Sequence, residues 1–269
     1  MRKHRIGKVI AVIIVAICAA WLLVTYVAEP LIDNRELTPI RQLHTQLQKD
    51  ETASSTGGGT SNKETGGDKS LSSLGIQNLV GWISISGTQV DYPVVQSTKD
   101  NPDFYLHHNV WGRSSTAGSI YLNANTPIDR NYLPIYGHHM NNGSMFGALV
   151  KYQTLDFARQ HPIINFESIK GGESRYKLAA VFTEAQSDPL HVNVVEPLVE
   201  ETFTAQWQML SEYSWYRAAD VQYGDRLIVL CTCSYSHKNE RTVVVARQMR
   251  AGESETVSIA KNPEAKSPW

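Results

Sequence analysis

The sequence predicts a mainly β domain in which eight strands form a barrel with few helices. Between residues 76 and 250, short runs of β-branched and aromatic residues alternate with turn residues. Few segments in this range place apolar residues at helical spacing. Many short strands with few helices are typical of a closed or nearly closed barrel. The net charge of -1 gives no electrostatic basis for a nucleic-acid partner.

A long apolar segment precedes this domain. Residues 9–28 carry no charge, and their 20 residues suffice for a helix to cross a bilayer. Residues 1–8 form a basic tail, which predicts a cytoplasmic N-terminus, an extracellular domain and a single-pass location in the cell membrane. The alternative is a cleaved signal peptide, whose apolar region is shorter and ends in a small-x-small site. Because the run is longer and ends in bulky residues, an uncleaved transmembrane helix is the better interpretation.

Residues 29–75 connect the apolar segment to the domain. Residues 29–50 place Leu and Ile at near-helical spacing, which predicts either a short helix or a partly ordered stalk. Residues 52–75 are rich in Gly, Ser and Thr and hold few apolar side chains. Such a composition is typical of a flexible linker. We therefore expect the domain to be tethered at a distance from its anchor.

The predicted strands of the domain are short and separated by turn residues. They are Val80–Ile85, Val90–Val95, Ser119–Leu122, Leu133–Tyr136, Ile163–Glu167, Tyr176–Thr183, Arg226–Cys231 and Arg241–Arg247. Short helices are predicted at Met145–Tyr152 and Thr154–Gln160. A longer helix is predicted at Glu200–Ser214, from apolar residues at i, i+4 and i+7, just before the strand that carries two cysteines. Residues 251–269 show no periodic pattern, which predicts a disordered C-terminal tail.

Cys231 and Cys233 are the cysteines outside the apolar N-terminal segment. An extracellular domain stabilised by disulfides normally contains more of them. Residues two apart on a strand point to the same face, and strand geometry opposes a bridge between them. A free thiol in this setting is a candidate for chemistry. The alternative is that Cys233 is a small buried apolar residue.

The surroundings of Cys233 favour a nucleophile. The Cys strand runs into a polar stretch at 234–240, which places the thiol near solvent. Arg241 then opens a returning strand, so that an antiparallel pair would set it close to Cys233. A guanidinium there would favour the thiolate and bind developing negative charge on oxygen. Otherwise Arg241 is a solvated cation at a strand end.

His138 is the candidate acid and base. It ends the run from Leu133 through Tyr136 and Gly137, and the glycine allows another element to approach the backbone closely. An imidazole beside a thiol can transfer protons near neutral pH. A hydrogen-bonding loop histidine is the alternative. A zinc site built from these His and Cys residues fits less well, because structural sites usually separate paired cysteines by two to four residues.

A thiol after Thr at a strand end, an Arg opening the next strand and an upstream Gly-His strand together resemble the sortases. The resemblance covers about residues 76–250. Local features are similar to class B sortases, and they are Ile135–Met140 (IYGHHM), Gly143–Gly147 (GSMFG), Asp103–Asn109 (DFYLHHN), Gly118–Tyr121 (GSIY) and the helix at 200–214. Sortases are membrane-anchored cysteine transpeptidases of Gram-positive bacteria.

The resemblance implies an eight-stranded sortase-type barrel and a catalytic triad of Cys233, His138 and Arg241. It implies cleavage of surface proteins after Thr in a C-terminal sorting signal, Asn-Pro-x-Thr-x or a related Pro-x-Thr motif. The Thr is then joined to an amine on a cell-wall precursor of the lipid II type. No metal or cofactor is required. Tyr136, Cys231 and Ser234 are the expected substrate-binding residues, although position 231 is often Ser in class B enzymes.

Four other functions stay open. Water could compete with the amine, which would make the protein a hydrolase. A pilin-polymerising sortase would use a Lys side chain as acceptor, whereas wall anchoring is usual for class B. An unrelated Cys–His peptidase would usually place Cys before His in the chain. A tethered, non-catalytic barrel that binds wall peptides would leave Cys233 as a packing residue.

Overall fold

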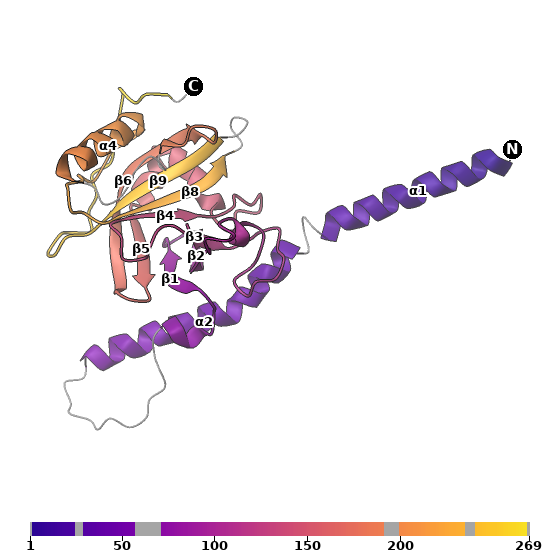
Figure 1. Ribbon diagram of the computed structural model, residues 1–269, viewed down its shortest axis with the longest axis horizontal. Helices are drawn as coiled ribbons and strands as arrows, with labels where there is room; N and C mark the ends of the chain where they lie inside the picture. The colour runs from indigo at the N-terminus through magenta and orange to yellow at the C-terminus, as the bar shows by residue number, and fades with distance from the viewer. Residues whose placement is uncertain (1, 25–28, 57–70, 191–198, 235–239, 268–269) are drawn as a thin grey trace.

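The computed structural model describes residues 2–24, 29–56, 71–190, 199–234 and 240–267 (Figure 1). Eight strands of this part of the chain close into a barrel in the order β1-β2-β3-β4-β8-β9-β6-β5. The strands are β1 (Leu79–Ser84), β2 (Asp91–Gln96), β3 (Ile120–Leu122), β4 (Tyr132–Tyr136), β5 (Ile163–Ser168), β6 (Gly172–Ala185), β8 (Leu227–Ser234) and β9 (Glu240–Gln248). The predicted eight-stranded barrel is therefore confirmed.

Two of the strand pairs are parallel. β2 pairs with β3 and β4 pairs with β8 in this way, whereas the remaining neighbours in the barrel are antiparallel. The parallel β4–β8 pair joins segments that are far apart in the chain. Because parallel strands run in the same direction, the C-terminal ends of β4 and β8 lie at the same end of the barrel.

Alternation along the strands creates two apolar cores. One core, here called the interior core, includes Ile228 and Leu230 of β8 and extends to residues outside the barrel strands, such as Leu37 and Ile259. The second, here called the outer cluster, includes Leu227, Val229 and Cys231, which point to the opposite face of β8. The other buried members of the outer cluster are Tyr132, Ala180, Phe182, Phe203, Leu210, Val243 and Val245.

Helix α4 (Glu200–Tyr213) covers the outer cluster with Phe203 and Leu210 (Figure 1). It matches the longer helix expected before the Cys strand. Of the shorter predicted helices, α3 (Leu155–Gln160) is found, but the segment before it is the 3-10 helix η4 (Gly147–Gln153). Met145 cannot start a helix because its φ is +55°. Two further short 3-10 helices are η2 (Leu71–Leu74) and η3 (Phe104–Leu106).

Helix α2 (Glu29–Thr56) packs along the barrel. His44 stacks on Trp82 of β1, with ring centroids 4.1 Å apart, and its Nε2 lies 2.8 Å from a carboxylate oxygen of Glu167 on β5. Leu37 is buried in the interior core. The segment expected as a helix or stalk is thus a helix held by specific contacts. It continues through the start of the expected linker, of which residues 57–70 lie outside the described part.

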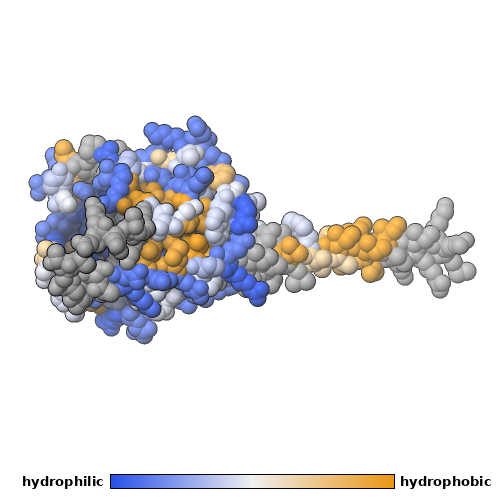
Figure 2. Space-filling model, turned by 90° about the horizontal axis from the view of Figure 1, so that it is seen from below, coloured by the Kyte–Doolittle hydropathy of each residue, from blue (hydrophilic) through white to orange (hydrophobic). Residues whose placement is uncertain are grey.

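Helix α1 (Arg2–Leu23) carries a row of exposed apolar side chains, visible as the orange stretch of the projecting helix in Figure 2. These side chains are Ile10, Val12, Ile13, Ile14, Val15, Ile17, Trp21 and Leu22, and Val24, just after the helix, is also exposed. Among the residues that are described, no helix combines the length and the apolar character needed to cross a membrane.

The expected disorder of residues 251–269 is wrong for the described part of that segment. β10 (Ala260–Lys261) pairs with β7 (Tyr216–Arg217), and Ile259 is buried in the interior core. Asn262 donates a side-chain hydrogen bond to the carbonyl of Ser214. The segment is held by isolated contacts and not by one periodic apolar face, which explains why periodicity did not reveal it.

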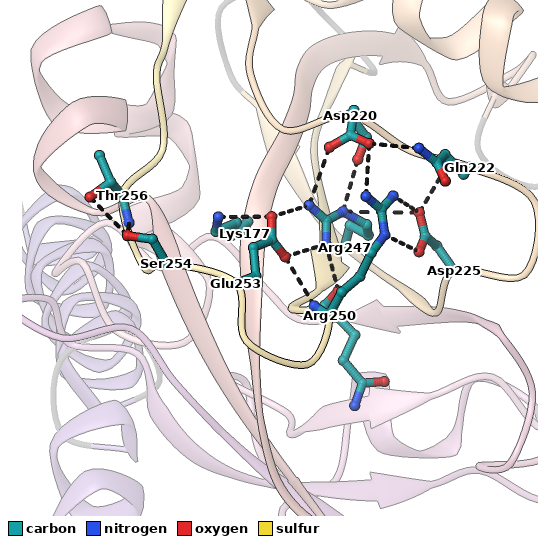
Figure 3. Close-up of polar contacts among 10 residues, drawn as sticks. Lys177, Asp220, Gln222, Asp225, Arg247, Arg250, Glu253, Ser254 and Thr256 are labelled. Carbon is teal, nitrogen blue, oxygen red and sulfur yellow. Dashed lines mark hydrogen bonds and ion pairs between the residues drawn. The ribbon is translucent and has the colours of Figure 1, made fainter.

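An ionic network, here called the Arg247 network, fixes the start of this segment (Figure 3). Arg247 is fully buried, and its guanidinium donates to the Asp220 and Gln248 carbonyls and to both carboxylate oxygens of Glu253. Arg250 forms a bidentate pair with Asp225. Such charge-assisted bonds satisfy a cation that would otherwise be costly to bury.

Candidate active site

The ends of β4 and β8 form the candidate site. Tyr136 lies opposite Cys231 in the parallel register, and the N–H of Gly137 donates to the Cys231 carbonyl at 3.2 Å. His138 and Cys233 each lie two residues beyond this pair along their own strands. The register therefore brings their backbones to the same edge of the barrel, as expected of a base and a nucleophile.

Arg241 completes this edge from the next strand. It lies directly opposite Cys233 in the antiparallel β8–β9 pair. Side chains of directly opposite residues project from the same face. The connection expected at 234–240 is shorter, because β8 runs to Ser234 and β9 starts at Glu240; residues 235–239 lie outside the described part. The side chains of Cys233 and Ser234 also lie outside it, so only their strand positions are assigned.

A backbone carbonyl fixes the protonation pattern of His138. The Nε2 atom lies 2.8 Å from the oxygen of Leu106, at the end of η3. Since a carbonyl oxygen only accepts, Nε2–H must be the donor, and Nδ1 carries the lone pair in the neutral ring. Burial lowers the pKa of His138, against the raising effect of the Leu106 carbonyl, and His107 lowers it further. The ring is therefore neutral at pH 7 and able to accept a proton at Nδ1.

Two glycines allow this arrangement. A Cβ at Gly118 would lie 2.5 Å from the Leu106 oxygen, and Gly118 also has a φ of +61°. A Cβ at Gly137 would lie 2.3 Å from Cδ1 of Ile120. The close approach that we expected at Gly137 is thus an approach of β3. Sequence reasoning missed Leu106 and Gly118, because a backbone acceptor leaves no side-chain signal, although both lie within the short motifs that carry the resemblance.

Tyr136 stands beside the proposed triad at the end of β4. Its ring stacks on Tyr121, with centroids 5.6 Å apart. Burial raises the pKa of Tyr136, the Cys231 thiol raises it further, and Arg241 acts in the opposite direction. The phenol is therefore neutral at physiological pH. Its partial exposure keeps it a candidate for contact with a substrate.

Cys231 differs from the expectation of a substrate contact. Its side chain is 2% exposed and belongs to the outer cluster. It packs there with Tyr132 and Tyr136 of β4, so it does not line the surface of the site. Position 231 therefore supports the site from below, whereas Cys233 lies at the strand end.

Comparisons with known proteins agree with this geometry. The sequence matches the Sortase domain family over residues 83–249. It is 38% identical to "Sortase B" of Listeria monocytogenes over 171 residues, which are 61% of this chain and 66% of the relative. It is 30% identical to "Sortase B" of Staphylococcus aureus over 176 residues, 64% of this chain and 70% of the relative. The first alignment thus spans slightly less than two thirds of the relative's length.

Comparison with solved structures also indicates a sortase fold. The X-ray structure of Clostridium perfringens sortase B has a TM-score of 0.60 and 28% sequence identity, and the match covers 64% of this chain and 94% of that one. The region matched by the family includes seven of the eight barrel strands in full and the three strand ends that carry His138, Cys233 and Arg241. The chain belongs to the sortase family, and its similarity is to class B members.

Proposed function

We propose that this protein is a cysteine transpeptidase that cleaves sorting signals of surface proteins and joins them to a cell-wall amine. The observation that carries the proposal is the register that brings the backbones of His138, Cys233 and Arg241 together at the ends of three adjacent strands. The membership of the sortase family supports it. The sorting signal is of the Asn-Pro-x-Thr-x or related Pro-x-Thr type, and the acceptor is a lipid II-type precursor.

The reaction proceeds in two halves. His138 accepts the proton of the Cys233 thiol, and the resulting thiolate attacks the Thr carbonyl to form a tetrahedral oxyanion, which Arg241 stabilises. Collapse breaks the peptide bond, leaves a thioester on Cys233 and releases the amine with a proton from His138. The incoming amine then gives a proton to His138 and attacks the thioester, so that the Thr forms a new amide and the thiolate is regenerated.

The proton travels through one nitrogen of His138. Nε2–H is engaged by the Leu106 carbonyl, which leaves Nδ1 as the atom that gives and receives the proton. The lowered pKa of His138 favours the neutral ring, which is the form that accepts the proton of the attacking amine. Tyr136 lines the same edge, where it can hold the substrate's backbone.

We also propose that residues 9–28 anchor the chain in the cell membrane, with the N-terminus in the cytoplasm and the barrel outside. The exposed apolar side chains of α1 support this location. Separating membrane and soluble fractions of cells that express the full chain or a chain lacking residues 1–28 tests it. Release of the shortened chain alone is the expected result, and equal release of both would contradict the anchor.

The catalytic proposal is tested with the full chain in detergent and a small set of fluorogenic Pro-x-Thr pentapeptides, with and without an amine acceptor. The variant is Cys233→Ala, and Cys18→Ala is the control for loss of a thiol outside the barrel. Cleavage and an amine-ligated product that require Cys233 are the expected result. If no peptide is cleaved and Cys233 resists alkylation in the folded protein, the non-catalytic barrel is the correct interpretation.

A further inference from the structure

Glu184 is a charged side chain buried in an apolar face. It lies near the end of β6, and its exposed fraction is 0%. By alternation it points to the same side as Phe182, which belongs to the outer cluster beneath α4. A carboxylate in such surroundings is costly to keep ionised unless a cation or hydrogen-bond donors compensate it. Its neighbours on this face therefore determine what it does.

The strand register places a cation next to it. Glu184 lies directly opposite Arg241 in the β6–β9 pair, and Arg241 lies directly opposite Cys233 in the β9–β8 pair. Directly opposite residues on one face have Cβ atoms about 4.5–5.5 Å apart. A carboxylate, a guanidinium and the position of the proposed nucleophile thus form one row across three strands, with the guanidinium in the middle.

Tyr136 shows that the two charges share one environment. Besides burial and the Cys231 thiol, Arg241 and Glu184 both act on the Tyr136 hydroxyl, with opposite effects on its pKa. Glu184 also acts on Tyr132, which lies on the same face of β4. The carboxylate therefore lies close enough to act on the tyrosines of β4, and because it is fully buried it is screened little by solvent.

We propose that Glu184 is a positioning residue that holds the Arg241 guanidinium in place at the oxyanion site. The role rests on the proposed transpeptidase function. An arginine has a long side chain with considerable rotamer freedom, and a carboxylate on its buried side fixes the planar group. The N–H groups on its other side then remain directed at the substrate, where a preorganised donor is most effective.

The test compares Glu184→Gln, Arg241→Ala and the double variant in the full chain, by steady-state cleavage of the sorting peptide. The substitution of Glu184 keeps the side-chain shape and removes the charge. A roughly 10- to 100-fold fall in kcat with little change in KM is expected, by analogy with the cost of a displaced catalytic group. The double variant should be no slower than Arg241→Ala alone. Independent, multiplicative losses would overturn the proposal.

Glu240→Gln is the matched control. Glu240 is also a buried carboxylate at the start of β9, but it neighbours Arg241 in sequence and so points to the opposite face. Its substitution should leave the kcat within about twofold, since it removes no group from the Arg241 row. An equal loss of kcat in both variants would show a general effect of buried charge and would refute a specific role for Glu184.

A measurement without turnover separates this inference from the proposed function. Thermal unfolding of the four proteins in the Glu184–Arg241 cycle reports whether the two side chains are coupled in the folded state. If the wild type cleaves no peptide but the cycle shows coupling, the transpeptidase proposal fails and the pairing stands. If the wild type is active and the cycle is additive in both stability and kcat, the positioning role is refuted.

Discussion

Glu253 offers a sharp test of the Arg247 network. It accepts two hydrogen bonds from Arg247 at 2.7 Å, one from Lys177 at 2.8 Å and one from the N–H of Arg250 at 2.9 Å. Glu253→Gln replaces one acceptor oxygen with an amide donor and removes the charge that compensates a fully buried guanidinium. Breaking a buried ion pair costs about 3–5 kcal/mol. Since the Glu253 side chain is 24% exposed and Asp220 and Asp225 remain nearby, we expect the lower end of that range.

Glu255→Gln is the matched control, two residues away in the same segment. Glu255 pairs with Arg175, but these side chains are 58% and 51% exposed. An exposed pair contributes less than about 1 kcal/mol. The assay is urea unfolding of the full chain and of both variants at pH 7, followed by tryptophan fluorescence. Similar losses in the two variants would refute the argument that burial of Arg247 makes the Glu253 pair the important one.

The stability difference between the wild type and Glu253→Gln should depend on pH, with a sign that follows from the pKa of Glu253. The hydrogen bonds from Arg247, followed by the one from Lys177, hold the pKa of Glu253 below its usual range. A carboxylate whose pKa is depressed by folding adds stability above its unfolded pKa, which is about 4.3, and loses it as the pH falls through the folded value. The difference between wild type and Glu253→Gln should therefore narrow below about pH 4. A difference that stays constant down to pH 3 would contradict this assignment.

Three further outcomes are expected. Gly137→Ala should destabilise the fold by about 2 kcal/mol in thermal unfolding, because the added methyl would overlap Cδ1 of Ile120 on β3. The control is Gly171→Ala, whose added methyl would meet one atom at 3.9 Å, and it should change the stability little. Relative to His138→Asn, the wild type should lose stability as the pH falls below about 6.5, because burial disfavours the charged ring. A difference in unfolding free energy between the two proteins that does not change with pH would contradict this. His44→Ala should increase hydrogen exchange in α2 and leave the barrel protected, while unchanged exchange in α2 would show that other contacts hold the helix.

The strands could be predicted from the sequence because their signals are local, whereas the catalytic roles of Cys233, His138 and Arg241 stay a prediction. Short runs of β-branched and aromatic residues between turn residues identified the barrel strands, and the polar residues after Cys233 indicated that it lies near a strand end. The register could not be predicted from periodicity, since it depends on pairing between segments that are distant in the chain. Leu106 was missed for a different reason, because it contributes its carbonyl and not its side chain.

Glu184 illustrates a limit of reading burial from residue type. The predicted strand stopped at Thr183, one residue before Glu184. In the structure β6 continues to Ala185, and the Glu184 side chain is fully buried. The cation that we propose as its partner, Arg241, lies on the neighbouring strand and can be identified only once the strands are paired. The C-terminal segment was missed in the same way, since a few specific contacts hold it.

The parallel pairing of β4 with β8 has a consequence for how the protein matures. The segments that carry His138 and Cys233 are far apart in the chain and become neighbours only when these two strands pair. Non-local pairing of this kind forms slowly compared with local turns and helices. A newly made chain would therefore keep Cys233 apart from His138 until its barrel closes, and the proposed chemistry, which needs both residues, would begin only with the completed fold.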